Sequence, residues 1–186
     1  MSGPSFNEAA PSPAARIRTE RPGDAAAIRH LNELAFDGYR EADVVDAVRA
    51  AGAVLLSVVA LGEDEELIAH ALVTPVAVTN DEGEAGLAGL GPVSVLPSAR
   101  ERGVGTQLIE VCLERLRALG HPAVVVLGEP DYYSRFGFIP ADRWGLRLEA
   151  GGLDDVFMAL ELIPGRLGGL TGTVRCRPEF DLLAGL

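Results

Sequence analysis

The stretch Leu90–Gly120 constrains the fold of this chain more than any other segment. Val93, Val95 and the apolar residues around them predict a buried strand, which Pro97 ends. From Val104 onward, apolar residues recur with the period of an amphipathic helix that closes near the last glycine of the stretch. Between strand and helix lies a tight turn, Arg100-Glu101-Arg102-Gly103-Val104-Gly105.

This turn predicts a binding site for phosphate groups. The first peptide N–H groups of a helix have no helical partner and carry the positive end of its dipole. Gly103 and Gly105 allow a ligand to approach the backbone closely. The two arginines of the turn add positive charge. A diphosphate fits such a helix N-terminus.

Two common nucleotide-binding patterns are excluded. A dinucleotide fingerprint needs a third glycine three residues after Gly105, and Leu108 occupies that position. All sixteen basic residues are arginine. A P-loop and Schiff-base chemistry both require lysine, so neither is present.

The composition narrows the function classes further. The 186-residue chain has a net charge of −11, which argues against nucleic-acid binding because phosphate contacts need a basic face. No apolar run is long enough to span a bilayer, so no membrane partner is expected. Cys112 and Cys176 form neither a CxxC pair nor a metal-binding spacing, which predicts no metal and a reduced, cytoplasmic protein.

The remaining elements predict a mixed α/β protein, not a regular alternation of strand and helix. Residues 1–14 read as a disordered leader, 15–163 as one domain, and 164–186 as a C-terminal extension that packs on the same domain. We expect helices at 25–36 and 41–51. The expected strands are 16–18, 54–61, 67–78 with Pro75 at a bend, the strand that opens the stretch above, 123–127, 144–150, 156–163 and 173–177.

Two separated motifs resemble the GNAT superfamily of acyl-CoA-dependent N-acetyltransferases. Arg100-x-x-Gly103-x-Gly105 follows a strand and opens a helix, as the superfamily's diphosphate signature does. Tyr133-x-x-x-Gly137-Phe138 is similar to its Y-x-x-x-G-F element. Either motif alone is weak, whereas both in this order are a strong signal. The resemblance implies a mostly antiparallel central sheet with flanking helices, in which the strand at 92–95 splays from its parallel neighbour at 123–127.

The resemblance also implies acetyl-CoA as co-substrate. Its pantetheine arm would lie along the splayed strand and bond to the main chain there, and its diphosphate would rest on the amides of the turn. The cofactor-binding residues implied are Val93, Ser94, Val95, Arg100, Glu101, Arg102, Gly103, Val104, Gly105 and Thr106.

The implied reaction is direct attack of a neutral amine on the thioester in a ternary complex. Tyr133 would donate a hydrogen bond to the leaving thiolate. Proton removal from the amine is open between Glu129, the first candidate, Asp131 and a water chain. The family's usual asparagine between strand and tyrosine is missing here. The neighbouring Tyr132 leaves the choice of tyrosine open, although the spacing to Gly137-Phe138 favours Tyr133.

The sequence does not identify the acceptor, which is a small-molecule or peptide amine. An alternative function is that of a non-catalytic acyl-CoA-binding regulatory protein that kept the cleft. The oligomeric state is open between a monomer and a homodimer paired through a strand of the C-terminal extension.

Overall fold

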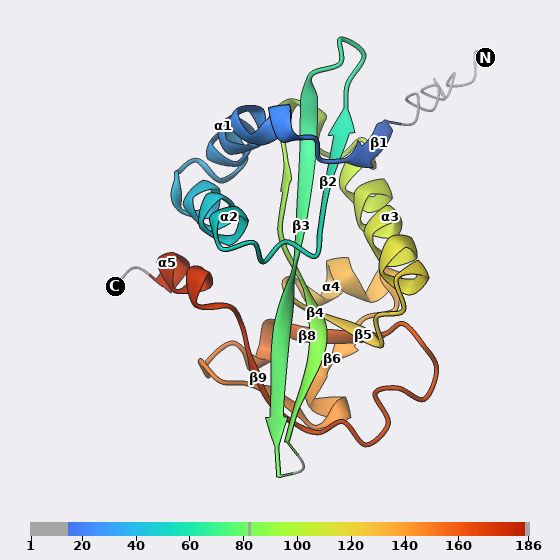
Figure 1. The fold of residues 1–186 in the computed structure, drawn as a ribbon. Helices are drawn as coiled ribbons and strands as arrows, with labels where there is room; N and C mark the ends of the chain where they lie inside the picture. The colour runs from blue at the N-terminus through green and yellow to red at the C-terminus, as the bar shows by residue number, and fades with distance from the viewer. Residues whose placement is uncertain (1–14, 82, 185–186) are drawn as a thin grey trace, which may run out of the picture.

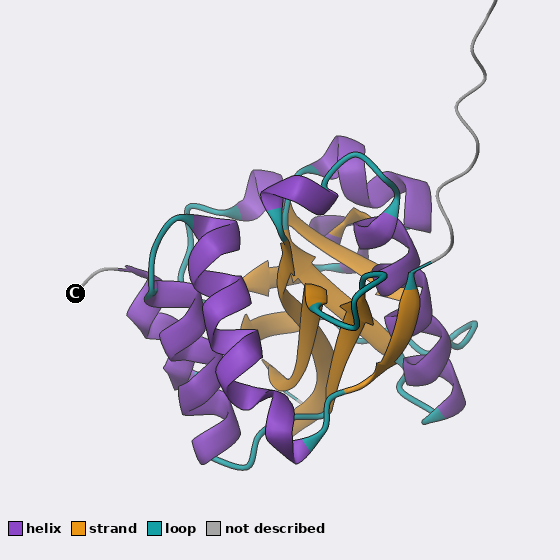
Figure 2. Cartoon of the chain, turned by 90° about the horizontal axis from the view of Figure 1, so that it is seen from above, coloured by secondary structure: helices purple, strands orange, loops and turns teal. Residues whose placement is uncertain are grey.

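The computed structural model describes residues 15–81 and 83–184, so the predicted leader 1–14 lies outside the described residues. Within them, nine strands form one mixed sheet. Helices cover both faces of this sheet (Figures 1 and 2).

The first part of the chain builds one side of the sheet and the two helices that cover it. Helix α1 has the predicted bounds, because its apolar residues recur with helical spacing and Ile28 and Leu31 are buried. A long hairpin of two strands follows, and it is the longest feature in Figure 1. The elements are β1 (Arg16–Thr19), α1 (Ala25–Phe36), α2 (Arg40–Ala50), β2 (Leu56–Leu61), β3 (Leu67–Asn80) and β4 (Gly83–Val95).

The second part of the chain adds the long helix and the remaining strands. The strand after the long helix, β5, also has the predicted bounds. The later strands are shorter than the sequence predicts. The elements are α3 (Val104–Ala118), β5 (Ala123–Leu127), α4 (Pro130–Tyr133), β6 (Ile139–Pro140), β7 (Leu146–Leu148), β8 (Phe157–Glu161), β9 (Gly172–Arg175) and α5 (Asp181–Ala184).

The strand order is β1-β2-β3-β4-β5-β8-β6, and β9 pairs with β3 and with β7. Most neighbours are antiparallel, whereas β4 and β5 run parallel, as do β7 and β9. The β4–β5 ladder has its last pair at Leu90 and Val126. Beyond that pair the two strands part, as the family resemblance implies. We call this point the split.

Alternate residues of β5 pack on opposite faces of the sheet. Val124 and Val126 join the core beneath α3. Ala123 and Val125 join a second core with β7, β8 and β9. A third cluster packs α1 and α2 against β2 and β3. Because successive side chains of a strand point to opposite faces of the sheet, β5 contributes to the cores on both faces.

Strand β3 continues through Pro75, which the sequence places at a bend. Pro75 pairs with Ala88 within the β3–β4 ladder, whose register shift lies between Ala71 and Val73. On the other edge of β3, pairing with β2 starts at Val73 and runs away from Pro75, and pairing with β9 begins only at Ala77. Pro75 therefore falls between the two partner strands on this edge, where its missing N–H costs no hydrogen bond between strands.

Candidate functional site

The turn before α3 has the conformation that a helix N-terminus exposed to a ligand requires. Gly103 is the N-cap of α3 with a φ of 77°, in the left-handed region that glycine adopts readily. Its carbonyl accepts the first helical bond from the amide of Gln107 at 3.0 Å. The free amides of the first turn of α3 therefore lie beside the cavity described next.

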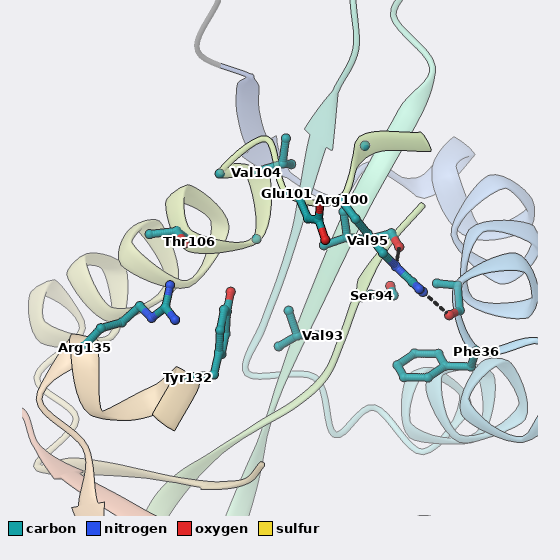
Figure 3. A pocket seen from close by; sticks show the side chains of 14 residues that line it. Phe36, Val93, Ser94, Val95, Arg100, Glu101, Val104, Thr106, Tyr132 and Arg135 are labelled. Atoms are coloured by element: carbon teal, nitrogen blue, oxygen red, sulfur yellow. Dashed lines mark hydrogen bonds between the residues drawn. The ribbon is translucent and has the colours of Figure 1, made fainter. Parts of the chain in front are cut away.

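This cavity has a volume of about 570 Å³, and we call it the α3 cavity. It joins the splayed end of β4, the turn before α3, the C-terminal end of α1 and the short helix α4 (Figure 3). Its lining residues are Ala35, Phe36, Val93, Ser94, Val95, Ala99, Arg100, Glu101, Gly103, Val104, Gly105, Thr106, Tyr132 and Arg135.

Nine of the ten residues that the sequence associates with the cofactor line this cavity. Arg102 is the exception, since it lines a separate cavity beside Arg16 and the acidic loop at 63–66. Ser94 is buried and its hydroxyl donates to the carbonyl of His70 at 3.3 Å. Glu101 carries a negative charge, so only its backbone suits a phosphate.

The Arg100 guanidinium holds two elements together at the rim. Its Nε donates to the carbonyl of Val95 at 3.2 Å, and its Nη2 donates to the carbonyl of Ala35 at 2.6 Å. The second carbonyl belongs to the last turn of α1, where helical partners are missing. Figure 3 shows the side chain reaching toward α1, away from the first turn of α3. Arg100 therefore ties β4 to α1.

Arg135 is a second cation in the cavity, and the sequence motifs do not single it out. Its guanidinium carbon lies 4.5 Å from the centroid of the Tyr132 ring. Among the described residues it forms no ion pair with a carboxylate. Figure 3 shows it facing Thr106 from across the cavity. The sequence feature that could have identified Arg135 is its position three residues after Tyr132, which places both side chains on one face of a helical turn.

The two adjacent tyrosines of α4 point to different places. The hydroxyl of Tyr132 lies beside the first turn of α3, only 3.1 Å from where a β-carbon on Gly105 would stand. Tyr133 does not line the α3 cavity. Its ring packs 5.6 Å from that of Phe138 and so close to Gly128 that a β-carbon there would lie 2.2 Å from the ring. Tyr133 therefore lies beside the end of β5, next to the split.

Tyr133 is 9% exposed. Burial, with a smaller contribution from Tyr132, raises the pKa of its phenol to about 12. The hydroxyl consequently stays protonated throughout the neutral range. Such a group can donate a hydrogen bond but gives up its proton reluctantly.

The proton acceptors proposed from the sequence lie at the surface. Glu129 is the N-cap residue of α4, and its backbone carbonyl accepts the amides of Tyr132 and Tyr133. Its side chain is exposed and lines none of the described cavities. Asp131 is exposed in the first turn of the same helix.

The described residues contain neither a candidate metal site nor a candidate membrane span. No group of three or more His, Cys, Asp or Glu side chains in this part of the chain is arranged to hold a metal ion. None of the helices described is both long and apolar enough to cross a membrane.

The chain is similar to known proteins of one family. The family model "Acetyltransferase (GNAT) domain" matches residues 16–141. The uncharacterized N-acetyltransferase YhbS of Escherichia coli K12 is 33% identical over 165 residues, which cover 89% of this chain and 98% of that protein.

Two solved structures share the fold over nearly the whole chain. The crystal structure of E. coli YhbS in complex with CoA has a TM-score of 0.86 at 33% identity and covers 92% of this chain and 94% of its own. A GNAT family acetyltransferase of Brucella melitensis in complex with acetyl-CoA has a TM-score of 0.72 at 37% identity, with 90% and 98% covered. The family expected from the two motifs is thus confirmed, and the chain belongs to the GNAT acetyltransferase family.

Proposed function

We propose that this protein is an N-acetyltransferase that moves the acetyl group of acetyl-CoA to a primary amine by direct attack in a ternary complex. The observation that carries the proposal is the α3 cavity, in which the open edge of β4 and the first turn of α3 line one space. A molecule with a diphosphate at one end and a peptide-like arm suits these two surfaces. The CoA and acetyl-CoA complexes of the two relatives support the same assignment.

The phosphate end of the cavity has two sources of positive potential. The amides from Gly103 to Thr106 contribute the first, because a helix N-terminus attracts anions. Arg135 contributes the second, since no carboxylate among the described residues neutralises it and it faces Thr106. In a chain with a net charge of −11, such local charge is needed to hold a polyanion.

The reacting end lies toward the split. The pantetheine arm would run along Val93 to Val95 and bring the thioester toward Gly128. There the amine nitrogen attacks the carbonyl carbon, a backbone N–H of β4 stabilises the developing oxyanion, and the carbon–sulfur bond breaks. Tyr133 is our candidate donor to the departing thiolate, because its ring packs against Gly128 and its phenol remains protonated.

The ammonium form of the amine must lose a proton to become a nucleophile. The nitrogen loses a second proton to water when the amide forms, and the departing thiolate takes up one proton from water. Glu129 follows Gly128 directly and is the nearest carboxylate in sequence to the split. Because its side chain is exposed, we propose that it takes the proton through water and not by direct contact.

Thermal unfolding with ligands tests the binding part of this proposal. Saturating acetyl-CoA should raise the midpoint by about 5–10 °C, since a ligand at 100 times its Kd stabilises by about 2.7 kcal/mol. ATP and NAD at the same concentration should change the midpoint little. No stabilisation by acetyl-CoA or CoA would overturn the proposal.

Release of free thiol from acetyl-CoA in the presence of amines tests the catalytic part. Amine-dependent release establishes transfer. Stabilisation by acetyl-CoA without thiol release for any amine in a broad panel would favour the alternative, a non-catalytic acyl-CoA-binding protein.

A further inference from the structure

A larger cavity lies on the other face of the sheet, between the C-terminal segment and β3. Its volume is about 930 Å³, and we call it the β9 cavity. Apolar side chains from several elements line it, among them Pro75, Leu127, Leu148, Leu153, Phe180 and Leu183. Leu127 and Leu153 are 42% and 43% exposed, although both are large and apolar. A cavity of this size and lining is typical of a site for an organic molecule.

The β9 cavity reaches the split from the side opposite α3. Leu127 is the residue after Val126, which forms the last pair of the β4–β5 ladder with Leu90. Val124 and Val126 pack toward α3, so the alternation of a strand directs Leu127 to the other face. Val93, three residues beyond Leu90, lines the α3 cavity. The two cavities thus approach the split from opposite faces of the sheet.

Most walls of the β9 cavity come from residues outside the family match, which ends at residue 141. The end of β7 and the loop after it contribute residues 148–150 and 153, and the C-terminal segment contributes residues 174–178, 180, 181 and 183. The segment is held in place because β9 pairs with β3 and β7 and α5 packs against α2 (Figure 1). This cavity is therefore built largely outside the region that the family model matches.

The charges around the β9 cavity leave a negative excess. Arg175 lies 3.6 Å from Glu84, and Arg177 lies 2.6 Å from Glu179, so both arginines are paired with carboxylates. Glu149 and Asp181 also line the cavity, and neither has a cationic partner among the described residues. A positively charged group is favoured at such a rim, and a carboxylate is disfavoured.

In this family the acceptor approaches the split from the side opposite the cofactor, which is the side of the β9 cavity. From the lining of this cavity we infer that the acceptor is a cationic amine on an apolar body without a carboxylate near the amine. The inference rests on the proposed function. The apolar body packs against the leucines of the cavity, the carboxylates attract the ammonium form, and the deprotonated nitrogen meets the thioester at the split.

Three amines that differ in one property each test this acceptor class. Phenethylamine has the apolar body and the charge, L-phenylalanine adds a carboxylate, and ethanolamine lacks the apolar body. We expect kcat/KM for phenethylamine to exceed both others by at least about tenfold, because one desolvated charge or one ring is worth more than about 1.4 kcal/mol. Equal or higher kcat/KM for either of the others, or no turnover of phenethylamine, overturns the inference.

A matched pair of variants ties that preference to the cavity. Leu153→Asn replaces an apolar part of the cavity wall by a polar, uncharged group, whereas Leu182→Asn makes the same change on a similarly exposed leucine of α5 that does not line the cavity. We expect KM for phenethylamine to rise about tenfold in the first variant and to stay unchanged in the second. Equal effects in both variants contradict the inference. Stabilisation by acetyl-CoA should persist in both, and its absence from the wild type would instead indicate failure of the proposed function.

Protection of Cys176 gives a readout that does not depend on turnover. Cys176 lines the β9 cavity and is partly exposed, whereas Cys112 lies on the buried face of α3. Burial and the nearby Asp181 raise the pKa of the Cys176 thiol, so labelling by N-ethylmaleimide should be slow and best followed at alkaline pH. Phenethylamine should slow the labelling of Cys176, and ethanolamine should not. Labelling of Cys176 at the same rate with and without phenethylamine argues against binding at this place.

Discussion

Arg135 and Tyr132 form a stacked pair on the wall of the α3 cavity, with the guanidinium carbon 4.5 Å from the ring centroid. The tyrosine hydroxyl in turn lies beside Gly105 in the first turn of α3. The ring thus holds the guanidinium across from the amides of that turn. A cation placed in this way adds to the potential of the helix N-terminus.

Arg135→Gln should weaken acetyl-CoA binding about tenfold, which corresponds to about 1.4 kcal/mol. The loss should shrink at high salt because the site is open to solvent. S-acetylpantetheine, which has no diphosphate, should bind both forms equally. Isothermal titration at two salt concentrations measures these effects. Dephospho-CoA, which lacks the 3′-phosphate, then tells which phosphate Arg135 contacts.

The matched control for this experiment is Arg143→Gln. Arg143 is also exposed but lines none of the described cavities. An equal loss of affinity in both variants would mean that only the overall charge matters, and Arg135 would have no specific contact.

The two tyrosines should separate binding from catalysis. Tyr133→Phe should lower kcat by about 100-fold and leave KM for acetyl-CoA unchanged, because the hydroxyl acts on the departing thiolate. Tyr132→Phe should raise KM for acetyl-CoA and change kcat little, since its hydroxyl lies at the phosphate end. The opposite pattern in steady-state kinetics would transfer the donor role to Tyr132.

The pKa of Tyr133 adds a prediction for the pH profile. Because burial raises this pKa to about 12, the phenol remains protonated below that value. Deprotonation of Tyr133 should therefore cause no decline of the wild-type rate up to about pH 10. Over this range the pH profile of Tyr133→Phe should have the same shape as that of the wild type. A decline with an apparent pKa near 9 that disappears in the variant would contradict the burial of Tyr133.

The sequence was sufficient to predict the elements that have a strong apolar pattern. Helix α1 has the predicted bounds because regular apolar spacing marks it, and strand β5 has them because it is an unbroken apolar run. The sequence does not reveal why Pro75 is tolerated inside a strand, because the edge of β3 that accepts proline depends on where β2 and β9 end. Such partners lie far apart in the sequence, and no local pattern reports them.

The candidate site was predictable to a similar degree. A backbone site follows from a strand–turn–helix pattern, and nine of ten residues expected there line the α3 cavity. Side-chain directions are harder, because one residue along a helix turns the side chain by about 100°. Tyr132 and Tyr133 therefore point apart, and Arg102 turns away from the cavity that Arg100 lines.

A buried polar chain beneath α1 predicts how stability depends on pH. Asn32 Nδ2 lies 3.3 Å from His70 Nδ1, and Ser57 Oγ lies 3.0 Å from His70 Nε2. An amide nitrogen can only donate, so Nδ1 accepts and Nε2 carries the proton. Ser57 in turn donates to Glu20. Protonation of Nδ1 would set two donors against each other.

Burial, and to a lesser extent Arg49, lowers the pKa of His70 to about 3. An unfolded histidine titrates near pH 6.5, so the folded state binds the proton more weakly. Stability from this group is complete above that pH and is lost as the pH falls toward 3, by about 1.4 kcal/mol per unit. Urea unfolding at pH 7.5 and 5.0 should show this loss, and His70→Gln should reduce it.

His30→Gln is the control for this measurement, since the His30 side chain is 71% exposed. It should leave the difference between the two pH values as in the wild type. A wild-type stability that is equal at both pH values would show that His70 titrates normally and is not buried as described.

Arg100 should act through its geometry and not only through its charge. Arg100→Lys keeps the charge but cannot reach the carbonyls of Val95 and Ala35 with one planar group. We expect a loss of about 1 kcal/mol in the free energy of unfolding. Arg143→Lys should cost nothing. If Arg100→Lys is as stable as the wild type while Arg100→Gln binds acetyl-CoA poorly, Arg100 serves as a phosphate ligand and not as a tie.

Glu129→Gln tests how the amine loses its proton. If Glu129 accepts that proton through water, the variant should lower kcat/KM at pH 7 by about 100-fold. The loss should diminish at higher pH, where more of the amine is already neutral. Asp131→Asn, which alters an equally exposed carboxylate of the same helix, should retain the wild-type profile. If the Glu129→Gln enzyme keeps the wild-type profile, solvent alone removes the proton from the ammonium group. The wide β9 cavity would give water access for this step.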